Sequence, residues 1–329
     1  MSVMLDPAPA SQVAVPHADP AIRLDGLTRY FGRMCAVESV SLSVPRGSVF
    51  ALLGRNGSGK STLVRMLMGL LPPTRGSAVI LEDDCQNIRP QTRGRIGYVA
   101  EGHPLIDWMR VRDLAGFQRS FYPAWDQKIF DTVIGHFGLA GGSRARNLSR
   151  GQRAGVSMAL VLATRPELLV MDDPAMGLDP VARRALLEAM ILVTRDAGHT
   201  IFFTSHEIAD VERVADHIAI LDVSVLRVAA PVDVFQSRVR RLALSLPASS
   251  APPLPAIRGL LQSRREADEL ILTLVDNDEP AERAAVDTAI ASLGAKSVRE
   301  IPLSLEDAVI AYLGQRDEGK SLLQEEVLR

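Results

Sequence analysis

The sequence predicts an α/β fold followed by a smaller α+β unit, and three observations support this prediction. Short apolar runs alternate with stretches of helical periodicity from about residue 49 to residue 221. A glycine-rich turn separates the first of these runs from the first helix. A segment rich in proline and serine then precedes a second set of strand and helix patterns.

The composition is that of a globular protein with a large core. The chain has 329 residues, of which 47% are hydrophobic and 23% charged, and its net charge is −2. This near balance excludes binding to nucleic acid or to an anionic membrane by bulk electrostatics alone. Cys35 and Cys85 are too few for a disulfide framework and fit a reducing compartment. No apolar run approaches the roughly 18 to 20 residues that cross a bilayer.

The sequence predicts a single α/β region for the first part of the chain. Residues 1–20 are rich in alanine and proline and are predicted to be a disordered leader. Interrupted alternation over 22–44 predicts short strands, and a helical pattern with aromatic residues over 108–144 predicts an insert, with outer limits of about 103–155. Further short buried strands are predicted, listed in chain order as Val49–Leu53, Leu168–Met171, Thr200–Thr204 and Ile218–Leu221.

A second, smaller unit is predicted over residues 236–315, followed by a tail at 316–329. Leu242, Leu244 and Leu246 alternate as in a strand, and the run 270–275 is also strand-like. A helix is expected from Pro280 to Gly294, and a further one after the capping residues Ser304 and Asp307. Two strands and two helices at least make this an α+β unit, with a proline-rich loop or linker at 247–255 after its first strand.

The most informative segment is the run Gly54-Arg55-Asn56-Gly57-Ser58-Gly59-Lys60-Ser61-Thr62. Its G-x-x-x-x-G-K-[ST] spacing lies between an apolar strand and a helix marked by Leu63, Met66, Leu67 and Leu70. Such a loop turns several backbone N–H groups and the positive end of a helix toward a polyphosphate. Lys60 adds a compact, flexible charge that an arginine would not replace. The segment therefore indicates binding of ATP or GTP.

Asn147-Leu148-Ser149-Arg150-Gly151-Gln152 resembles the signature motif of ABC ATPases, whose usual form is Leu-Ser-Gly-Gly-Gln. Arg150 departs from that form at the first glycine. The resemblance implies that Ser149, Gly151 and Gln152 contact the γ-phosphate of an ATP bound by the other subunit of a dimer. The resemblance also implies a RecA-like P-loop NTPase core over residues 21–235, with an N-terminal antiparallel β subdomain and an α-helical insert.

Leu168-Leu169-Val170-Met171-Asp172-Asp173 is similar to the second nucleotide motif of that family. The resemblance assigns Mg²⁺ to Asp172 together with the hydroxyl of Ser61. Asp173 stands where the family has a glutamate that polarises the attacking water, so its carboxylate is one methylene shorter. Glu101 stands where the family has a metal-sensing glutamine, and we expect it to tune Mg²⁺ binding.

Three further positions follow the family's order. Gly177-Leu178-Asp179-Pro180 is similar to the loop that contacts the opposite subunit, and Thr204-Ser205-His206-Glu207 to the segment of the switch histidine. The resemblance therefore assigns Lys60, Asp173 and His206 to catalysis. It places Phe31, with Tyr30 as the alternative, against the adenine ring. The remaining histidines are assigned structural roles; they are His17, His103, His136, His199 and His217.

Residues 22 to about 235 carry this resemblance, and finer features resemble the ATPase subunits of bacterial ABC-2 type exporters. These are Glu101, the segment 121–126, the run 149–155 and the segment 304–308. The subgroup implies a homodimer or heterodimer of ATPase subunits that uses ATP and Mg²⁺ to drive a separate transmembrane permease. It implies a cytoplasmic protein, peripheral at the inner face of the cell membrane, with no direct nucleic-acid binding.

Two alternatives remain at the level of sequence. A soluble ABC ATPase acting on ribosomes or DNA would normally carry a second cassette or a long coiled coil, and neither pattern is present. A nucleotide-binding regulator with weak turnover is suggested by Asp173. Leu105, Ile106, Trp108 and Met109 are expected either to receive a permease helix or to pack inside the insert.

Overall fold

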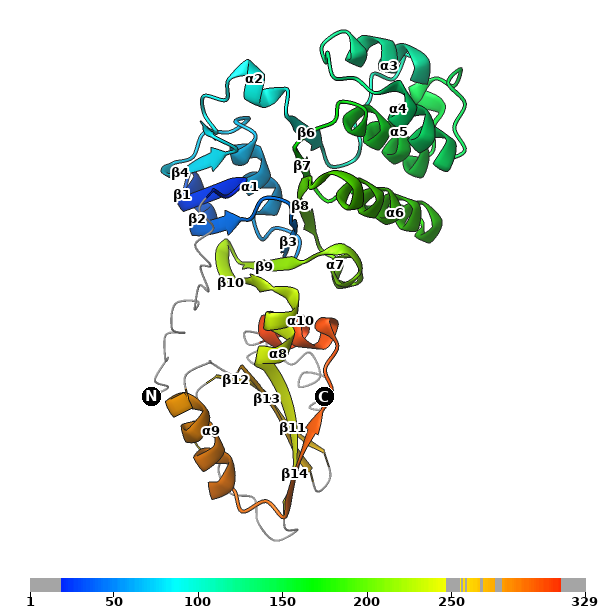
Figure 1. Ribbon diagram of the computed structural model, residues 1–329. Coiled ribbons are helices and arrows are strands. Elements are labelled where there is room, and N and C mark those ends of the chain that lie inside the picture. The colour runs from blue at the N-terminus through cyan, green and yellow to red at the C-terminus, as the bar shows by residue number, and fades with distance from the viewer. Residues whose placement is uncertain are drawn as a thin grey trace, which may run out of the picture. The chain divides into compact units, whose positions relative to one another are not determined.

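The computed structural model describes residues 19–246, 255, 257, 259–266, 269–275 and 280–314. The chain forms two compact units, one ending at Pro231 and the other beginning at Val232 (Figure 1). The predicted tail lies outside the described residues, as do residues 1–18 of the predicted leader and 247–254 of the predicted loop.

Within the described residues the first unit contains a sheet of ten strands in the order β5-β4-β1-β2-β10-β9-β3-β8-β7-β6. The strands are β1 (Ile22–Phe31), β2 (Met34–Val44), β3 (Val49–Leu53), β4 (Arg75–Ile80), β5 (Asp83–Asp84), β6 (Ile96–Val99), β7 (Leu168–Met171), β8 (Thr200–Ser205), β9 (His217–Asp222) and β10 (Val225–Pro231).

Five adjacent strands of this sheet, β9-β3-β8-β7-β6, run parallel to one another. All residues of β3, β7 and β8 are buried, as is typical of parallel strands covered on both faces. The accompanying helices are α1 (Lys60–Leu67), α2 (Pro90–Arg93), α6 (Pro180–Ala197) and α7 (Ile208–Val214). Parallel strands end at a common edge, where ligands of such sheets bind, and this edge carries the candidate site.

The antiparallel part of the sheet corrects one sequence expectation. In place of several short strands, β1 and β2 are two long antiparallel strands. Ile22 pairs with Val44 at one end of the hairpin, and Phe31 pairs with Met34 at the other. The register shifts three times along β1. Each shift is a bulge that breaks the alternation of buried and exposed side chains, so one long strand looks like several short ones in the sequence.

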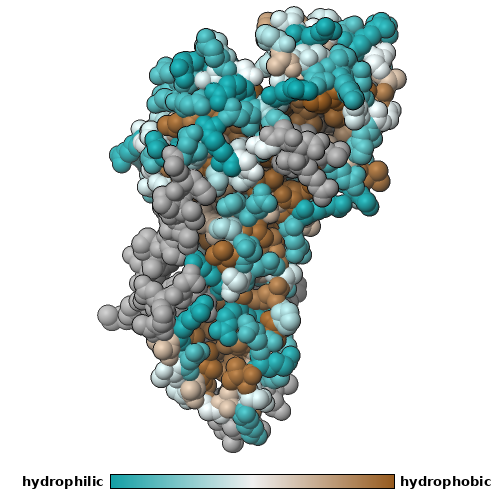
Figure 2. Space-filling view, in the orientation of Figure 1, coloured by the Kyte–Doolittle hydropathy of each residue, from teal (hydrophilic) through white to brown (hydrophobic). Residues whose placement is uncertain are grey.

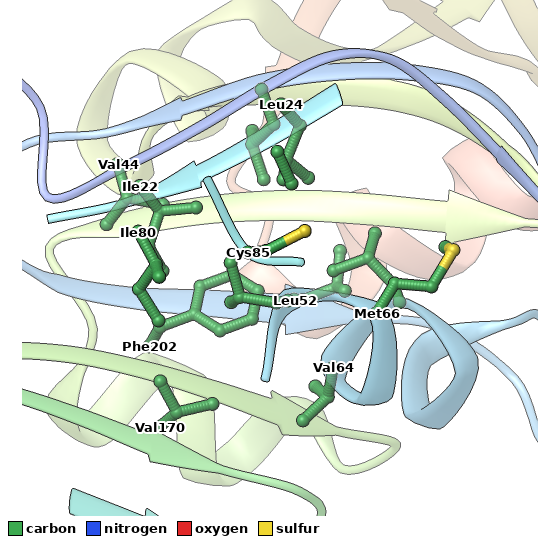
Figure 3. Packing of buried hydrophobic residues seen from close by; sticks show 14 of the residues in the cluster. Ile22, Leu24, Val44, Leu52, Val64, Met66, Ile80, Cys85, Val170 and Phe202 are labelled. Carbon is green, nitrogen blue, oxygen red and sulfur yellow. The ribbon is translucent and has the colours of Figure 1, made fainter. Parts of the chain in front are cut away.

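The two parts of the sheet share one core with α1 (Figure 3). Figure 3 shows Phe202 and Leu52 of the parallel strands close to Ile80 of the antiparallel strands, with Val64 and Met66 of α1 nearby. Leu70 does not belong to this face as its spacing had predicted. The helix ends at Leu67, and Leu70 is 62% exposed beyond it.

The helical insert is α3 (Val111–Arg119), α4 (Gln127–His136), a 3₁₀ turn at Ala145–Asn147 and α5 (Arg150–Leu162), which group together in Figure 1. These helices bury a separate core that includes Phe130, Ile134 and Val156. Leu105, Met109 and Trp125 pack against this core. Side chains left exposed include Trp108 (72%), Phe121 (64%) and Ile106 (38%), and Figure 2 shows apolar residues among hydrophilic ones over this region.

The second unit is a four-stranded antiparallel sheet within the described residues, in the order β12-β13-β11-β14. Its elements are α8 (Val232–Arg238), β11 (Val239–Ser245), β12 (Leu260–Glu266), β13 (Glu269–Val275), α9 (Pro280–Ser292), β14 (Ser297–Ile301) and α10 (Leu305–Gly314). Leucines of β11 and β13 bury one face of the sheet against Ile290 and Leu293. The sequence did not reveal β12 and β14, because their mostly exposed residues lack an apolar alternation.

No helix among the described residues combines the length and apolar character that a bilayer crossing requires.

Candidate functional site

The phosphate loop, Gly54–Thr62, connects the buried end of β3 to the first residue of α1. Gly59 caps this helix with φ of 107°, a conformation that favours glycine. A Cβ at Gly59 would lie 2.1 Å from the carbonyl oxygen of Ala36 on β2. The loop can therefore approach β2 only with glycine at this position, which leaves the N-terminus of α1 uncovered by side chains.

Lys60 lies within this loop and is only 6% exposed. Its Nζ donates hydrogen bonds to the carbonyl oxygens of Gly54 at 2.7 Å and Arg55 at 3.3 Å. Burial lowers the pKa of the lysine, and the nearby carboxylates of Asp173, Asp172 and Glu101 oppose this effect. The ammonium is thus held where a phosphate could replace its carbonyl partners.

Asp172 directly follows the strand β7 and is buried. Its Oδ1 accepts hydrogen bonds from Ser61 Oγ at 2.9 Å and from Thr204 Oγ1 at 3.0 Å. The described residues contain no group of three or more His, Cys, Asp or Glu that could hold a metal by themselves. Mg²⁺ bound with a nucleotide uses one or two carboxylates plus phosphate oxygens and water. The oxygens of Ser61 and Asp172 fit a cation that shares its ligands with a nucleotide.

Glu101 follows β6, the neighbour of β7 in the sheet. Its side chain is exposed, and its charge contributes to the pKa shifts of both Lys60 and Tyr98. The structure places this carboxylate within electrostatic reach of the lysine. Its expected contact with Mg²⁺ stays a prediction.

Asp173 and His206 form a direct hydrogen bond of 2.6 Å between Oδ2 and Nδ1. The backbone N–H of Asp173 donates to Thr204 Oγ1 at 2.8 Å, and Asp173 has a left-handed φ of 43°. Burial raises the pKa of Asp173, while the bond to His206 and the charge of Lys60 lower it. We call Asp172, Asp173, Thr204 and His206 the carboxylate edge. Its arrangement suits a base that accepts a proton beside a phosphate.

The residues expected to act on a partner's nucleotide form a second cluster at the start of α5. Ser149 Oγ accepts from the backbone N–H of Gln152, and Gln152 Oε1 accepts from the N–H of Ser149, so the pair is a capping box. A Cβ at Gly151 would lie 2.5 Å from Cβ of Ala182 on α6. Because α5, which carries the signature motif, contacts α6 at this point, the signature motif lies beside the loop Gly177–Pro180 that leads into α6.

Arg150, the departure in the signature, lies along that loop. A Cβ built on Gly177 would be 3.1 Å from Arg150 Nη1, so the side chain runs over this glycine. Asp179 then caps α6 by accepting from two backbone N–H groups. The larger side chain at position 150 is thus accommodated on the exposed surface of the cluster.

Phe31, proposed for the adenine ring, ends β1 and is 43% exposed. The guanidinium of Arg29 lies 4.8 Å from the centre of its ring. A hydrogen bond with Cys35 raises the pKa of the alternative residue, Tyr30. Phe31 therefore presents an accessible aromatic face, and its contact with adenine stays a prediction.

The hydrogen bonds that two side chains make beside this site were not predicted from the sequence. Thr204 was noted only as part of the switch segment, although its hydroxyl bonds both carboxylate residues of the edge. A threonine hydroxyl at the end of a buried strand was the available signal. His103 was assigned a structural role, and its buried ring donates from Nε2 to the carbonyl oxygen of Pro174 at 2.8 Å. Burial lowers the pKa of this histidine.

Comparisons with known proteins agree with this geometry. The ABC transporter family matches residues 37–176. The Nod factor export ATP-binding protein I of Bradyrhizobium diazoefficiens is 35% identical over 210 residues, which cover 61% of this chain and 67% of that protein. The methionine import ATP-binding protein MetN of Mesorhizobium japonicum is 32% identical over 260 residues, which cover 73% of this chain and 70% of that protein.

A solved structure shows the same fold. A dimeric ATP-binding cassette in a post-hydrolysis state with ADP and Pi aligns with a TM-score of 0.57 and 21% identity, covering 64% of this chain and 98% of that one. At this identity the likeness concerns the fold alone. Because both relatives above are at least 30% identical and are matched over two thirds of their length or more, we conclude that the chain belongs to the ABC transporter family, as one of its ATP-binding proteins.

Proposed function

We propose that this protein is the ATPase subunit of an ABC-2 type exporter and drives a separate membrane permease. The bond between Ser61 Oγ and Asp172 Oδ1 carries this proposal, because it joins the phosphate loop to a carboxylate 111 residues away. An oxygen pair beside a buried lysine is the arrangement that a magnesium nucleotide requires. The Nod factor export relative supports the direction of transport.

In this proposal the phosphate loop binds the triphosphate and the carboxylate edge promotes its hydrolysis. The N–H groups of the loop and the ammonium of Lys60 hold the β- and γ-phosphates. Asp173 accepts the proton of the attacking water, and His206 orients that carboxylate through its Nδ1. Mg²⁺, when bound at Ser61 and Asp172 with Glu101 nearby, neutralises charge on the phosphates. The raised pKa of Asp173 makes it a stronger base than an exposed aspartate.

The active form is proposed to be a homodimer or heterodimer of ATPase subunits. The hydroxyl of Ser149 and the N–H of Gly151 lie at the N-terminus of α5, which favours an anion such as the partner's γ-phosphate. Gln152 holds this terminus in place through the capping box. The dimeric cassette found among the solved structures supports this assembly. ATP binding would close the dimer, and hydrolysis would reopen it.

The permease is proposed to dock on the helical insert at the inner face of the membrane. Of the four apolar residues considered from the sequence, Leu105 and Met109 pack into the insert, whereas Ile106 and Trp108 stay exposed. Exposed apolar side chains of this size mark interaction surfaces when they cluster. This surface would place the protein in the cytoplasm, peripheral to the membrane.

One observation favours a second candidate, a nucleotide-binding regulator with weak turnover. Asp173 is shorter than the family's glutamate, and its carboxylate is already bonded to His206. A displacement of about 1 Å in a catalytic group can lower a rate by about 100-fold.

One experiment separates the two candidates. The purified protein is assayed for phosphate release with Mg²⁺ and ATP beside a Lys60→Ala variant, and a tagged form is extracted in detergent from its own cells. We expect turnover that is lost in Lys60→Ala, together with co-purification of a multi-spanning membrane protein. ATP binding without turnover would favour the regulator, and turnover without any membrane partner would contradict the transporter role.

A further inference from the structure

His103 occupies a tight turn between Glu101 and the helical insert. Gly102 and His103 are consecutive residues with left-handed φ values of 74° and 51°, and the N–H of His103 donates to Ala100 O at 3.2 Å. A histidine with positive φ is strained, since its Cβ crowds the backbone. Such strain persists where surrounding contacts enforce it, and it is concentrated at functional sites.

The ring of His103 is buried and only half satisfied. It is 3% exposed, and its Nε2 lies 2.8 Å from the carbonyl oxygen of Pro174. A carbonyl oxygen only accepts, so Nε2 carries the hydrogen. Within the described part of the chain, Nδ1 has no hydrogen-bond partner. A buried nitrogen without a partner destabilises the fold, so an apolar side chain would fill this space at lower cost. What the histidine adds is the single bond to Pro174.

That bond acts one residue beyond Asp173, on the carbonyl group of Pro174 in the peptide that joins Pro174 to Ala175. The ring of Pro174 restricts its own φ, so the direction of its carbonyl group depends on one remaining dihedral angle. The hydrogen bond from His103 holds this angle. On the other side, Thr204 Oγ1 accepts from the N–H of Asp173 at 2.8 Å. The left-handed backbone of Asp173, with φ of 43°, thus lies between the bond of its own N–H to Thr204 and the bond of His103 to the next residue, while its carbonyl oxygen accepts from the N–H of Met176 at 3.1 Å.

We propose that His103 is a positioning residue that holds the backbone after Asp173 and thereby aims the Asp173 carboxylate at the attacking water. The inference rests on the proposed role of Asp173 in hydrolysis. His103 itself touches neither nucleotide nor water in this scheme. It acts through Pro174, whereas from the sequence this histidine was assigned a structural role.

The test compares three substitutions of this histidine in the full-length protein. His103→Leu removes the donor, His103→Gln places an amide N–H near the position of Nε2, and His103→Asn places one near Nδ1. We expect His103→Leu and His103→Asn to lower kcat about 10- to 100-fold with the KM for ATP within about twofold of wild type. His103→Gln should recover most of the kcat.

A control variant and a double-mutant cycle distinguish a positioning role of His103 from a packing role. The control variant is His136→Leu, which changes an exposed histidine on α4 and should leave kcat unaltered. The second is a double-mutant cycle with Asp173→Asn. If His103 acts through Asp173, adding His103→Leu to Asp173→Asn should not lower the residual kcat further.

Three results would overturn the inference. They are an unchanged kcat in His103→Leu, an equal loss in His103→Gln and His103→Leu, or effects that multiply in the double mutant. A wild-type protein without turnover would instead refute the proposed function, and this inference with it. The wild-type and Asp173→Asn assays are run beside the others, so the two failures are told apart.

Discussion

The phosphate loop and the carboxylate edge lie next to each other, yet they are built in opposite ways. The loop is one continuous segment whose shape depends on glycine backbone conformations and on β3 and α1 at its ends. The edge joins the ends of β7 and β8 through side-chain bonds between residues 31 to 33 apart in the chain. The groups of the loop that would bind phosphates thus come from one short segment, whereas the residues proposed for turnover are brought together by contacts between strands. The two functions should be separable by mutation.

The largest expected effect is on turnover alone. Asp173→Asn removes the base and keeps the shape of the side chain, so we expect kcat to fall by about 10²- to 10⁴-fold. Because the loop is untouched, the affinity for ATP measured by calorimetry should stay within a few-fold of wild type. A parallel loss of affinity would show that the edge also builds the binding site.

A change in the loop should have the opposite pattern. Gly59→Ala puts a Cβ 2.1 Å from Ala36 O at a positive φ, so we expect the affinity for ATP to fall by about 100-fold or more, or about 3 kcal/mol. Gly57→Ala is the matched control, since its φ is also positive but its Cβ meets nothing within 4 Å. It should show only the backbone strain of about 1–2 kcal/mol. Equal effects at both positions would refute the close-approach argument.

Thr204→Val tests the bonds inside the edge. Valine keeps the shape but leaves the buried N–H of Asp173 without its acceptor, which should destabilise the protein by about 1–3 kcal/mol. We expect kcat to fall by about 10-fold with little change in ATP affinity. Thr132→Val, on the exposed surface of α4, is the control for threonine replacement. Chemical denaturation and steady-state assays on both variants would decide the matter.

The aromatic residue at the end of β1 should make a smaller contribution to binding. Phe31→Ala removes one stacking face, for which we expect the KM for ATP to rise by about 3- to 10-fold with kcat unchanged. Met34→Ala is the control, because Met34 pairs with Phe31 in the hairpin and is likewise exposed. The same KM in both variants would remove Phe31 from the site.

The smallest effect concerns stability and pH. Burial raises the pKa of Asp173, so its ionised form is less favourable in the folded than in the unfolded protein. This loss of stability is complete at pH values above the pKa of Asp173 in the folded protein, and it disappears as the pH falls through that pKa toward the pKa of the unfolded protein. Asp173→Asn should therefore raise the melting temperature at neutral pH, and the gain should shrink toward acid pH. A gain that grew on acidification would contradict the shift.

The sequence predicted most of what depends on local patterns. The strands β7 and β8 were placed within a residue of their observed limits, because continuous apolar runs are visible without tertiary context. The lengths of β1 and β2 were missed because bulges interrupt their alternation. The strands β12 and β14 were missed because exposed strands carry no apolar signal.

The candidate site divides along the same line. Lys60 was predicted from the spacing of the phosphate-loop motif, and Asp172, Asp173 and His206 from the resemblance to ABC ATPases. The hydrogen-bond partners of these residues could not be predicted in this way. The bonds made by Thr204 and His103 depend on which strands become neighbours, and this is decided only when β8 pairs with β7 and the turn after β6 meets the loop after β7.

The amino-acid sequence by itself determined a nucleotide-binding α/β architecture. It did so because an apolar strand, a glycine-rich loop and Lys60 follow one another within a few residues. Only the tertiary structure decided how the acid after β7 is aimed. Its backbone N–H donates to a hydroxyl from β8, and the carbonyl group of the next residue accepts from an imidazole in the turn after β6. Such hydrogen bonds require donor and acceptor within about 3 Å, and residues this far apart in the chain come that close only in the folded protein.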